Sequence, residues 1–497
     1  MTKAMKRLEA MRSLLEDAHH KLGLDFGFEL WDGSFVPATI DPDDLRISIA
    51  DEGVIAGLVR KPGLDRVINA YVAGRLDIKN GTIFDLAVRR PQGKVGRVLR
   101  QLSKLKILNL IMRFRFAAVD APTPLAGIKG DSIVRDGKPE TNKQNVHYHY
   151  DVSNEFYRLF LDPEMVYTCG YFTEWHDDIA RAQKDKLDMI CRKLRLKPGE
   201  KLLDIGCGWG ALICHAAQHY GVEAVGVTLA EEQAKLAREK IERLGLQDKV
   251  TVVLKDYTQM EGEFDKISSI GMFEQVGIVN HQTYFQTVNR LLRPRGLYLH
   301  HSIHRRAKKR DKDFSKLKPE YRALIRYIFP GGELDHLGMS VANLERNGFE
   351  VHDVEAWREH YQRTCKLWFD RLNANREAAV REVGEEKTRM WLLYLGGCSL
   401  AFERSAVGIC QTLASKRTRG PSGLPSTRAD LYLKKSAEIS VSNEVAPIEQ
   451  AILSEDIGVK QEAPKKTAPK KAPVRKPAAK AAPKTTVRKK KADTEKT

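Results

Sequence analysis

Reactive side chains recur in short motifs in the middle of this 497-residue chain. They include a carboxylate, a histidine, a tyrosine and two thiols, at Glu274, His301, Tyr361, Cys169 and Cys398. Groups of these types give and take protons in catalysis. Several follow strand-like segments, and the carboxyl ends of strands in an α/β sheet collect ligands. The five side chains could therefore converge on one site, although a lone cysteine is usually a small buried hydrophobe.

A glycine turn gives a second chemical signal. The segment Leu203–Ala211 reads LDIGCGWGA, a strand that runs into a glycine turn and then a helix. Glycines let a ligand approach the backbone closely, where a Cβ would obstruct it. Because Gly206, Gly208 and Ala211 also satisfy the dinucleotide pattern, the loop alone does not identify the cofactor.

The next strand helps to decide between two cofactors. A nicotinamide site requires Asp or Glu at the tip of that strand to hold the ribose hydroxyls. Here the tip reads Gly226-Val227-Thr228-Leu229, and Glu231 and Glu232 already belong to the following helix. Asp204 before the glycines and Asp256-Tyr257 at a later strand end fit a methyltransferase-type nucleoside site. The sequence therefore favours S-adenosylmethionine over NAD.

Alternating strands and helices are expected to position these residues. The candidate strands are Lys201–Ile205, Val222–Val227, Val250–Leu254, Lys266–Ile270 and Gly296–His301, and the candidate helix is Glu231–Leu244. Strands separated by helices indicate a mostly parallel, doubly wound sheet. We expect an α/β, Rossmann-like fold in a domain over residues 146–430.

The N-terminal region is expected to form a smaller mixed α+β domain over residues 1–118, followed by a linker or flap over 119–145. Its opening residues predict a surface helix and not a signal peptide, and Phe26–Trp31 and Leu45–Ile49 resemble strands. The segment Lys94–Phe116 is basic and amphipathic, so it could lie on an anionic membrane. An ordinary packed helix with a solvated basic face explains the same spacing equally well.

The charge is concentrated at the C-terminal end. Fourteen lysines and arginines stand against three acids over Lys460–Thr497, a net charge of +11 within the chain's +18. The Lys-, Ala- and Pro-rich tail over 431–497 cannot bury a core and should be disordered. It could contact nucleic acid or anionic lipid. No run approaches the ~20 apolar residues of a membrane span, and the seven cysteines lack metal-finger spacing, which indicates a reduced, cytosolic protein without structural zinc.

Together, and in this order, the motifs closely resemble the cyclopropane-fatty-acyl-phospholipid synthase and mycolic acid cyclopropane synthase family. The resemblance runs from about His147 to Arg417 and is carried by HYDVSNEFYRLFLDPEMVYTCGYF, LLDIGCGWGALICHAA, GVTLAEEQ, SSIGMFEQVG, GLYLHHSI, YIFPGG and GGCSLAFER. It unites a class I methyltransferase core with a Tyr-x-Cys segment before it and a late cysteine after it. The N-terminal domain resembles the extra domain of the phospholipid-acting branch.

The resemblance implies adenosylmethionine as the one-carbon donor and a cis-unsaturated acyl chain of membrane phospholipid as the acceptor. It assigns cofactor binding to Tyr167, Gly206, Gly208, Thr228, Leu229, Gln233 and Tyr257. It implies a bicarbonate ion held by Cys169, Glu274, His301, Tyr361 and Cys398, which together handle a proton, and no metal. It also implies an enzyme that is peripheral to the inner membrane, with a homodimer as a further possibility.

Departures from the family pattern bear on the product. His300 precedes His301 where one histidine is expected, and alignment from Gly296 favours His301, with His300 facing the other side of the strand. Gln275 stands where the family often carries histidine, and Ser399-Leu400 follow Cys398 where smaller residues are common. The expected product is a cyclopropane ring. The alternatives are a methyl- or methylene-branched chain and, from another class, a nucleic-acid-binding protein that acts through the basic tail.

Overall fold

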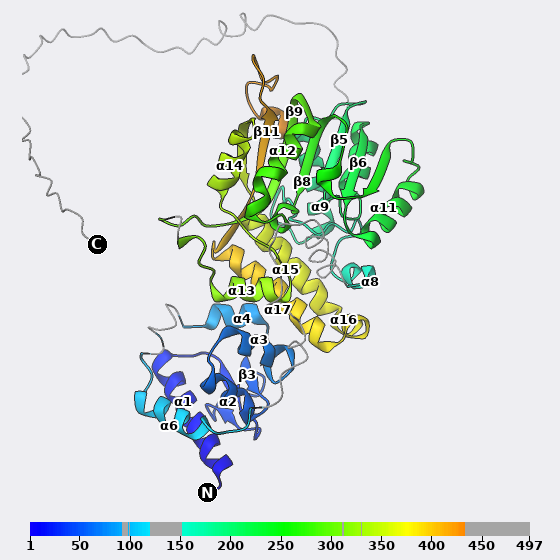
Figure 1. Cartoon of the computed structure of the whole chain (residues 1–497). Coiled ribbons are helices and arrows are strands. Elements are labelled where there is room, and N and C mark those ends of the chain that lie inside the picture. The colour runs from blue at the N-terminus through cyan, green and yellow to red at the C-terminus, as the bar shows by residue number, and fades with distance from the viewer. Residues whose placement is uncertain (92–97, 99, 120–151, 311–312, 330, 433–497) are drawn as a thin grey trace, which may run out of the picture. The chain divides into compact units, whose positions relative to one another are not determined.

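The computed structural model describes residues 1–91, 98, 100–119, 152–310, 313–329 and 331–432 (Figure 1). The predicted linker and tail therefore lie outside the described residues, apart from Val119, Leu431 and Tyr432, and part of Lys94–Phe116 is also outside them.

The N-terminal region contains a four-stranded sheet in the order β2-β1-β3-β4. The strands are β1 (Gly27–Glu29), β2 (Phe35–Val36), β3 (Arg46–Ile49) and β4 (Leu76–Lys79), and the helices are α1 (Lys3–Leu22), α2 (Glu52–Arg60), α3 (Leu64–Val72), α4 (Ile83–Arg89) and α6 (Lys104–Phe114). Strand β1 pairs parallel with β3, and the other two pairings are antiparallel. The predicted mixed α+β character and the predicted N-terminal helix are confirmed.

A seven-stranded sheet in the order β10-β11-β9-β8-β5-β6-β7 forms the second part of the described chain. Its strands are β5 (Lys201–Ile205), β6 (Glu223–Thr228), β7 (Val250–Leu254), β8 (Phe264–Ile270), β9 (Leu292–Arg305), β10 (Phe349–Ala356) and β11 (Val407–Lys416). Strands β5 to β9 pair in parallel, and β11 runs antiparallel between β9 and β10. The predicted doubly wound sheet is confirmed.

Helices cover both faces of this sheet (Figure 1). They are α8 (Asn154–Arg158), α9 (Ile179–Lys193), α10 (Ala211–Tyr220), α11 (Glu231–Arg243), α12 (His281–Leu291), α13 (Pro319–Tyr327), α14 (Leu337–Arg346), α15 (Arg358–Ala374), α16 (Arg376–Val383), α17 (Glu385–Glu403) and α18 (Ala429–Tyr432), with short turns η3 (Tyr257–Gln259), η4 (Phe273–Gln275) and η5 (Ile278–Asn280). One apolar core joins α9, α10 and α11 to the sheet, and another joins α12 and α14 to it. Strand β5 is buried at four of its five positions, as expected for a strand covered on both faces.

A third apolar core lies among α8, α15 and α17. It contains Phe156, Tyr361, Trp368 and Trp391, together with Cys169 from the segment before α9. This aromatic layer stands beside the carboxyl ends of the parallel strands, because Tyr167, which precedes α9, packs within it. It therefore adds a wall to the edge of the sheet at which α/β proteins bind ligands.

In the part of the chain that is described, no helix is long and apolar enough to cross a membrane.

Candidate active site

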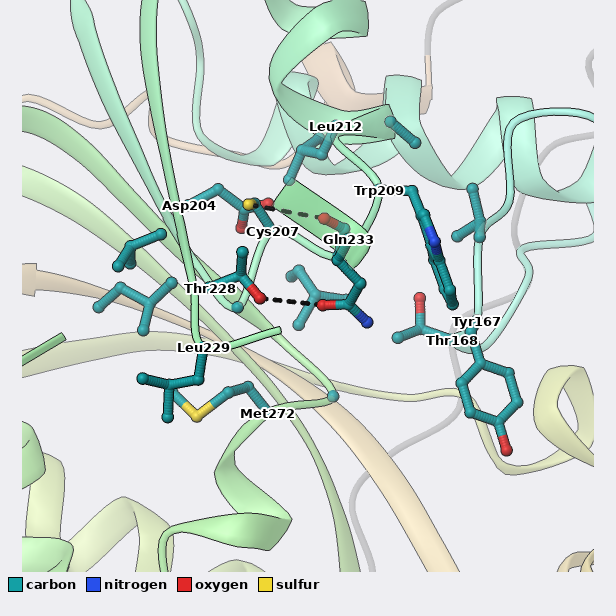
Figure 2. A pocket seen from close by; sticks show the side chains of 18 of the residues that line it. Tyr167, Thr168, Asp204, Cys207, Trp209, Leu212, Thr228, Leu229, Gln233 and Met272 are labelled. Atoms are coloured by element: carbon teal, nitrogen blue, oxygen red, sulfur yellow. Dashed lines mark hydrogen bonds between the residues drawn. The ribbon is translucent and has the colours of Figure 1, made fainter. Parts of the chain in front are cut away.

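A pocket opens at the carboxyl ends of β5, β6 and β8 (Figure 2). It is lined at these ends by Gly206, Thr228 and Gly271, and beyond β7 by Tyr257. All seven residues assigned to the cofactor by resemblance line this one pocket: Tyr167, Gly206, Gly208, Thr228, Leu229, Gln233 and Tyr257. This is the expected ligand position for an open α/β sheet.

The glycine turn leaves the backbone bare at the pocket wall. Gly206 has φ +82°, in the left-handed region, and a Cβ built on it would lie 2.8 Å from the Cβ of Met272. Its N–H donates to the carbonyl oxygen of Val227 at 2.9 Å, which fixes the turn against β6. A side chain here would therefore be strained and would collide, while glycine lets a ligand reach the main chain.

The tip of β6 carries a hydroxyl, which bonds to an amide on α11, where a nicotinamide site carries a carboxylate. The Thr228 hydroxyl donates to Oε1 of Gln233 at 2.9 Å (Figure 2). Because the bond to Thr228 uses the amide oxygen and not the nitrogen, the N–H groups of Gln233 can donate to a ligand. Leu229 follows on the pocket wall as an apolar surface. These groups suit a neutral adenosine moiety, in line with the prediction from the sequence.

Two buried charged groups, Lys186 and Asp204, line the same pocket. Asp204 was expected there from the sequence, but Lys186 was not. Lys186 on α9 is 2% exposed and donates to the Thr168 hydroxyl at 2.9 Å. Burial lowers the pKa of Lys186 to about 8, although Asp162 and Asp204 oppose that shift. Burial raises the pKa of Asp204 to about 6, and its carboxyl accepts the Ser268 hydroxyl at 2.7 Å. The sequence could have indicated a buried Lys186, because it shares the buried face of α9 with apolar side chains.

The two adjacent histidines on β9 face opposite sides of the sheet, as predicted. His300 bonds to Tyr298 and Ser302 through its two ring nitrogens, at 2.9 and 3.0 Å. His301 instead approaches Gln411 on β11, with 3.1 Å between Nδ1 and the amide nitrogen. Alternation of side chains along a strand explains this separation.

Glu274 lies on η4, next to the pocket. Its Oε1 accepts the N–H of Ile303 at 2.5 Å, and its Oε2 is buried without a partner among the described residues. Burial raises the pKa of Glu274 to about 7, and Asp335 adds to the increase. The next residue, Gln275, lines the pocket. Glu274 is therefore a carboxyl group that can exchange a proton near neutral pH.

Tyr361 and the two thiols belong to the aromatic layer. Burial raises the pKa of the Tyr361 phenol well above its usual range, and Cys365, Cys169, Glu274 and Cys398 add to the increase. Tyr361 and the three thiols belong to one apolar core. Burial raises the pKa of Cys398 to about 12 and that of Cys169 well above its usual range. Both thiols are therefore protonated at neutral pH and are not thiolate nucleophiles.

Trp357 connects His301 to this group. Its ring meets the His301 ring edge to face at 5.2 Å, and its carbonyl oxygen lies 3.9 Å from Cys169 Sγ. The five residues proposed to handle the proton are not among those that line the cofactor pocket. Cys169, Glu274 and His301 adjoin its wall. Thr168 and Gln275 in the lining are the sequence neighbours of Cys169 and Glu274, and the Gly271 N–H donates to the His301 carbonyl oxygen at 2.9 Å.

Comparison with known proteins agrees with this architecture. The family model described as mycolic acid cyclopropane synthetase matches residues 137–412. The chain is 36% identical over 426 residues to a Pseudomonas putida protein named "Probable fatty acid methyltransferase", covering 85% of this chain and 100% of that protein. It is 38% identical over 268 residues to the cyclopropane-fatty-acyl-phospholipid synthase of Escherichia coli K12, covering 54% and 66% of the two chains.

Solved structures of cyclopropane synthases also resemble the catalytic region of this chain. The mycolic acid cyclopropane synthase CmaA1 in complex with SAH and CTAB is 34% identical, with a TM-score of 0.52 over 55% of this chain and 98% of its own. The cyclopropane synthase MmaA2 from Mycobacterium tuberculosis is 32% identical, with a TM-score of 0.53 over 55% of this chain and 98% of its own.

Proposed function

We propose that this chain forms cyclopropane rings at cis double bonds in phospholipid acyl chains. It belongs to the mycolic acid cyclopropane synthetase family and is an S-adenosylmethionine-dependent methyltransferase of class I fold. The observation that carries the proposal is a pocket that adjoins Glu274 and His301, with Glu274 Oε2 and His301 Nε2 both buried and unpartnered in the described part of the chain.

The pocket residues fit the cofactor. Gly206 and Gly208 provide a bare backbone, and Gln233 keeps its amide donors for a ligand. Lys186 and Asp204 provide a buried cation and a buried carboxyl group in the same lining, which suit the carboxylate and the ammonium of the methionine moiety. When bound, adenosylmethionine supplies an electrophilic methyl group.

The pocket and the aromatic layer beside it would orient the reactants. An alkene is a weak nucleophile, so the acyl double bond must be aligned closely with the methyl donor, and orientation can supply ~7 to 11 kcal/mol of such a barrier. Addition of a methyl group leaves a positive charge on the acyl chain. Ring closure then requires loss of a proton from the added carbon, for which a base must be in place.

Glu274, His301, Tyr361 and the two thiols are the groups proposed to hold and move that proton. Glu274 Oε2 and His301 Nε2 are both buried without a partner among the described residues, which fits a small polar ligand between them. Bicarbonate held by these residues would supply a base and a negative charge at this position. Since both thiols are protonated, they would serve as weak donors and not as nucleophiles.

The N-terminal helix α6 supports contact with a lipid surface. Leu110 and Phe114 on it are buried, while Leu105, Leu108 and Met112 are 79%, 52% and 56% exposed. These three positions follow helical spacing on one face, and Lys104, Arg113 and Arg115 nearby are exposed cations. An exposed apolar face with flanking positive charges fits an anionic membrane surface. We therefore favour the membrane interpretation of this segment over a fully packed helix.

A branched product is the second candidate. Relatives named as probable fatty acid methyltransferases, from Pseudomonas putida and Mycobacterium tuberculosis, match 85% and 80% of this chain. Gln275, which stands in place of a frequent family histidine, lines the pocket with its Oε1 buried and unpartnered among the described residues. A hydride shift before proton loss would give a methyl or methylene branch.

Incubation of the enzyme with adenosylmethionine and vesicles of unsaturated phospholipid, followed by NMR of the acyl product, tests the proposal. Ring methylene protons are the expected result. A branched methyl or methylene signal would replace the first candidate by the second, and unchanged olefin would contradict both.

A further inference from the structure

We propose that Gln411 and Lys193 are positioning residues that hold His301 in one tautomer, with the proton on Nε2. The inference deepens the proposed function, since it assigns a chemical state to a residue of the proposed proton-handling group. It rests on a chain of three side chains behind the site, on α9, β11 and β9.

The buried Lys193 sets the direction of the hydrogen bonds among these three side chains. Lys193 Nζ lies 2.7 Å from Oε1 of Gln411 and also pairs with Glu355. An ammonium group has donors and no acceptor, so the Gln411 atom that faces it must be the carbonyl oxygen. The orientation of the amide follows from this chemistry, which removes the usual ambiguity between the amide oxygen and nitrogen.

The amide nitrogen of Gln411 then faces His301. It lies 3.1 Å from Nδ1. Because an amide nitrogen can only donate, Nδ1 must offer a lone pair, and a proton on Nδ1 would place two N–H groups against each other. The neutral ring therefore carries its proton on Nε2.

The surroundings keep the ring neutral. His301 is 1% exposed, and burial lowers its pKa well below the usual range, with the charges of Lys186, Lys193 and His300 acting in the same direction. Trp357 packs against His301 at 5.2 Å and against the Lys193 ammonium at 5.0 Å, so it holds in place the first and last side chains of this hydrogen-bonded series. Glu355 partly compensates the buried charge of Lys193.

The protonated Nε2 is the ring nitrogen that is left for a ligand. Nε2 of His301 is buried and has no partner among the described residues, as is true of Glu274 Oε2. His300, by contrast, has both ring nitrogens bonded to hydroxyls of the core. His301 is therefore the histidine kept ready to donate to an anion, and Gln411 and Lys193 act through it.

The tautomer can be measured directly in the full chain. In protein labelled with ¹⁵N-histidine, the ring signals of His301 are assigned as those lost in His301→Gln. In the wild type we expect a protonated Nε2 and an unprotonated Nδ1. A protonated Nδ1 in the wild type would overturn the inference without the use of any Gln411 variant.

Substitution of Gln411 then tests the positioning role. In Gln411→Glu the carboxylate accepts from Lys193 and from His301, so the proton should move to Nδ1. Turnover should fall at least tenfold, and by no more than the ~10²- to 10⁴-fold contribution of a positioned acid or base. Affinity for S-adenosylhomocysteine should change less than twofold. The matched control is Thr412→Val, the next residue on β11, whose hydroxyl is buried without a partner in the described structure.

The outcomes separate the two proposals. An unchanged tautomer in Gln411→Glu, or an equal turnover loss in Thr412→Val, would refute the positioning role. A moved proton with full turnover would support the hydrogen-bonded series Lys193, Gln411 and His301 but would contradict the role of His301 in the proposed function. Gln411→Leu should give a mixture of tautomers, and a single Nε2-protonated form in that variant would also refute the inference.

Discussion

Replacement of Glu274 by glutamine should stabilise the ligand-free protein and reduce its activity. Glu274 keeps its backbone partner Ile303 as glutamine, because the retained carbonyl oxygen can accept the same N–H. The variant loses a carboxylate whose Oε2 is buried without a partner among the described residues. Ionisation of that group is unfavourable in the folded protein and not in the unfolded chain.

The magnitude follows from the pKa. Burial raises the pKa of Glu274 from 4.5 to about 7, which corresponds to about 3 kcal/mol. Below pH 4.5 the carboxyl is protonated in both states, so it contributes no pH dependence. Between 4.5 and 7 the unfolded chain releases a proton that the folded protein keeps, so wild-type stability falls as pH rises. The advantage of Glu274→Gln should therefore grow by about 3 kcal/mol from pH 4.5 to pH 8.

Urea unfolding of both proteins at pH 5, 6, 7 and 8, in buffers free of bicarbonate, measures this difference. Glu239→Gln, which removes an exposed carboxylate from α11, controls for the general effect of a lost negative charge. A difference between wild type and Glu274→Gln that does not change with pH would refute the burial argument. Turnover of Glu274→Gln should fall at least tenfold, while affinity for adenosylmethionine should change little.

Four further substitutions and one deletion test the site and the contact with lipid. Gly206→Ala should weaken binding of S-adenosylhomocysteine at least tenfold in calorimetry, because the left-handed backbone costs a side chain ~1 to 2 kcal/mol and the Cβ would meet Met272; unchanged affinity would contradict this. Cys398→Ala should lower turnover but not cofactor affinity, and loss of cofactor binding would show that the division of roles is wrong. Lys186→Met should weaken binding of S-adenosylhomocysteine but not of methylthioadenosine, which lacks the amino acid moiety; equal losses would indicate a structural role. Leu108→Glu should reduce sedimentation with anionic vesicles roughly tenfold, and deletion of Lys460–Thr497 can reduce it too. Turnover on detergent-dispersed lipid should persist in both variants. Unaltered vesicle binding by Leu108→Glu would contradict the role of α6.

Much of the catalytic fold was predictable because the parallel strands are short apolar runs between polar helices. Strands β5 and β7 match their predicted bounds, while β9 extends beyond its predicted end at His301 to Arg305. The additional polar residues of β9 are strand because they pair with β11 along its length. Strands β10 and β11 were not predicted. The sequence of β10, FEVHDVEA, is rich in acids, and its strand structure depends on pairing with β11 at the edge of the sheet.

The residues that line the cofactor pocket at the glycine turn and the strand tips were more predictable than the buried residues around them. Glycines and strand tips are visible in the sequence, and all seven assigned cofactor residues line one pocket. Lys186 and Gln411 carry no motif. Their importance depends on burial and on partners far away in the chain, such as Lys193 for Gln411, 218 positions apart. Pairings of this kind arise from tertiary packing and are not encoded in local spacing.

The central claim is that a one-carbon unit is added to an acyl double bond and then loses a proton beside Glu274 and His301. Adenosylmethionine with a fully deuterated methyl group, supplied with unsaturated phospholipid vesicles, tests it most directly. The account predicts a cyclopropane product whose added carbon retains two of its three deuterium atoms. Retention of all three in a branched chain, or no deuterium in the acyl chain at all, would contradict it.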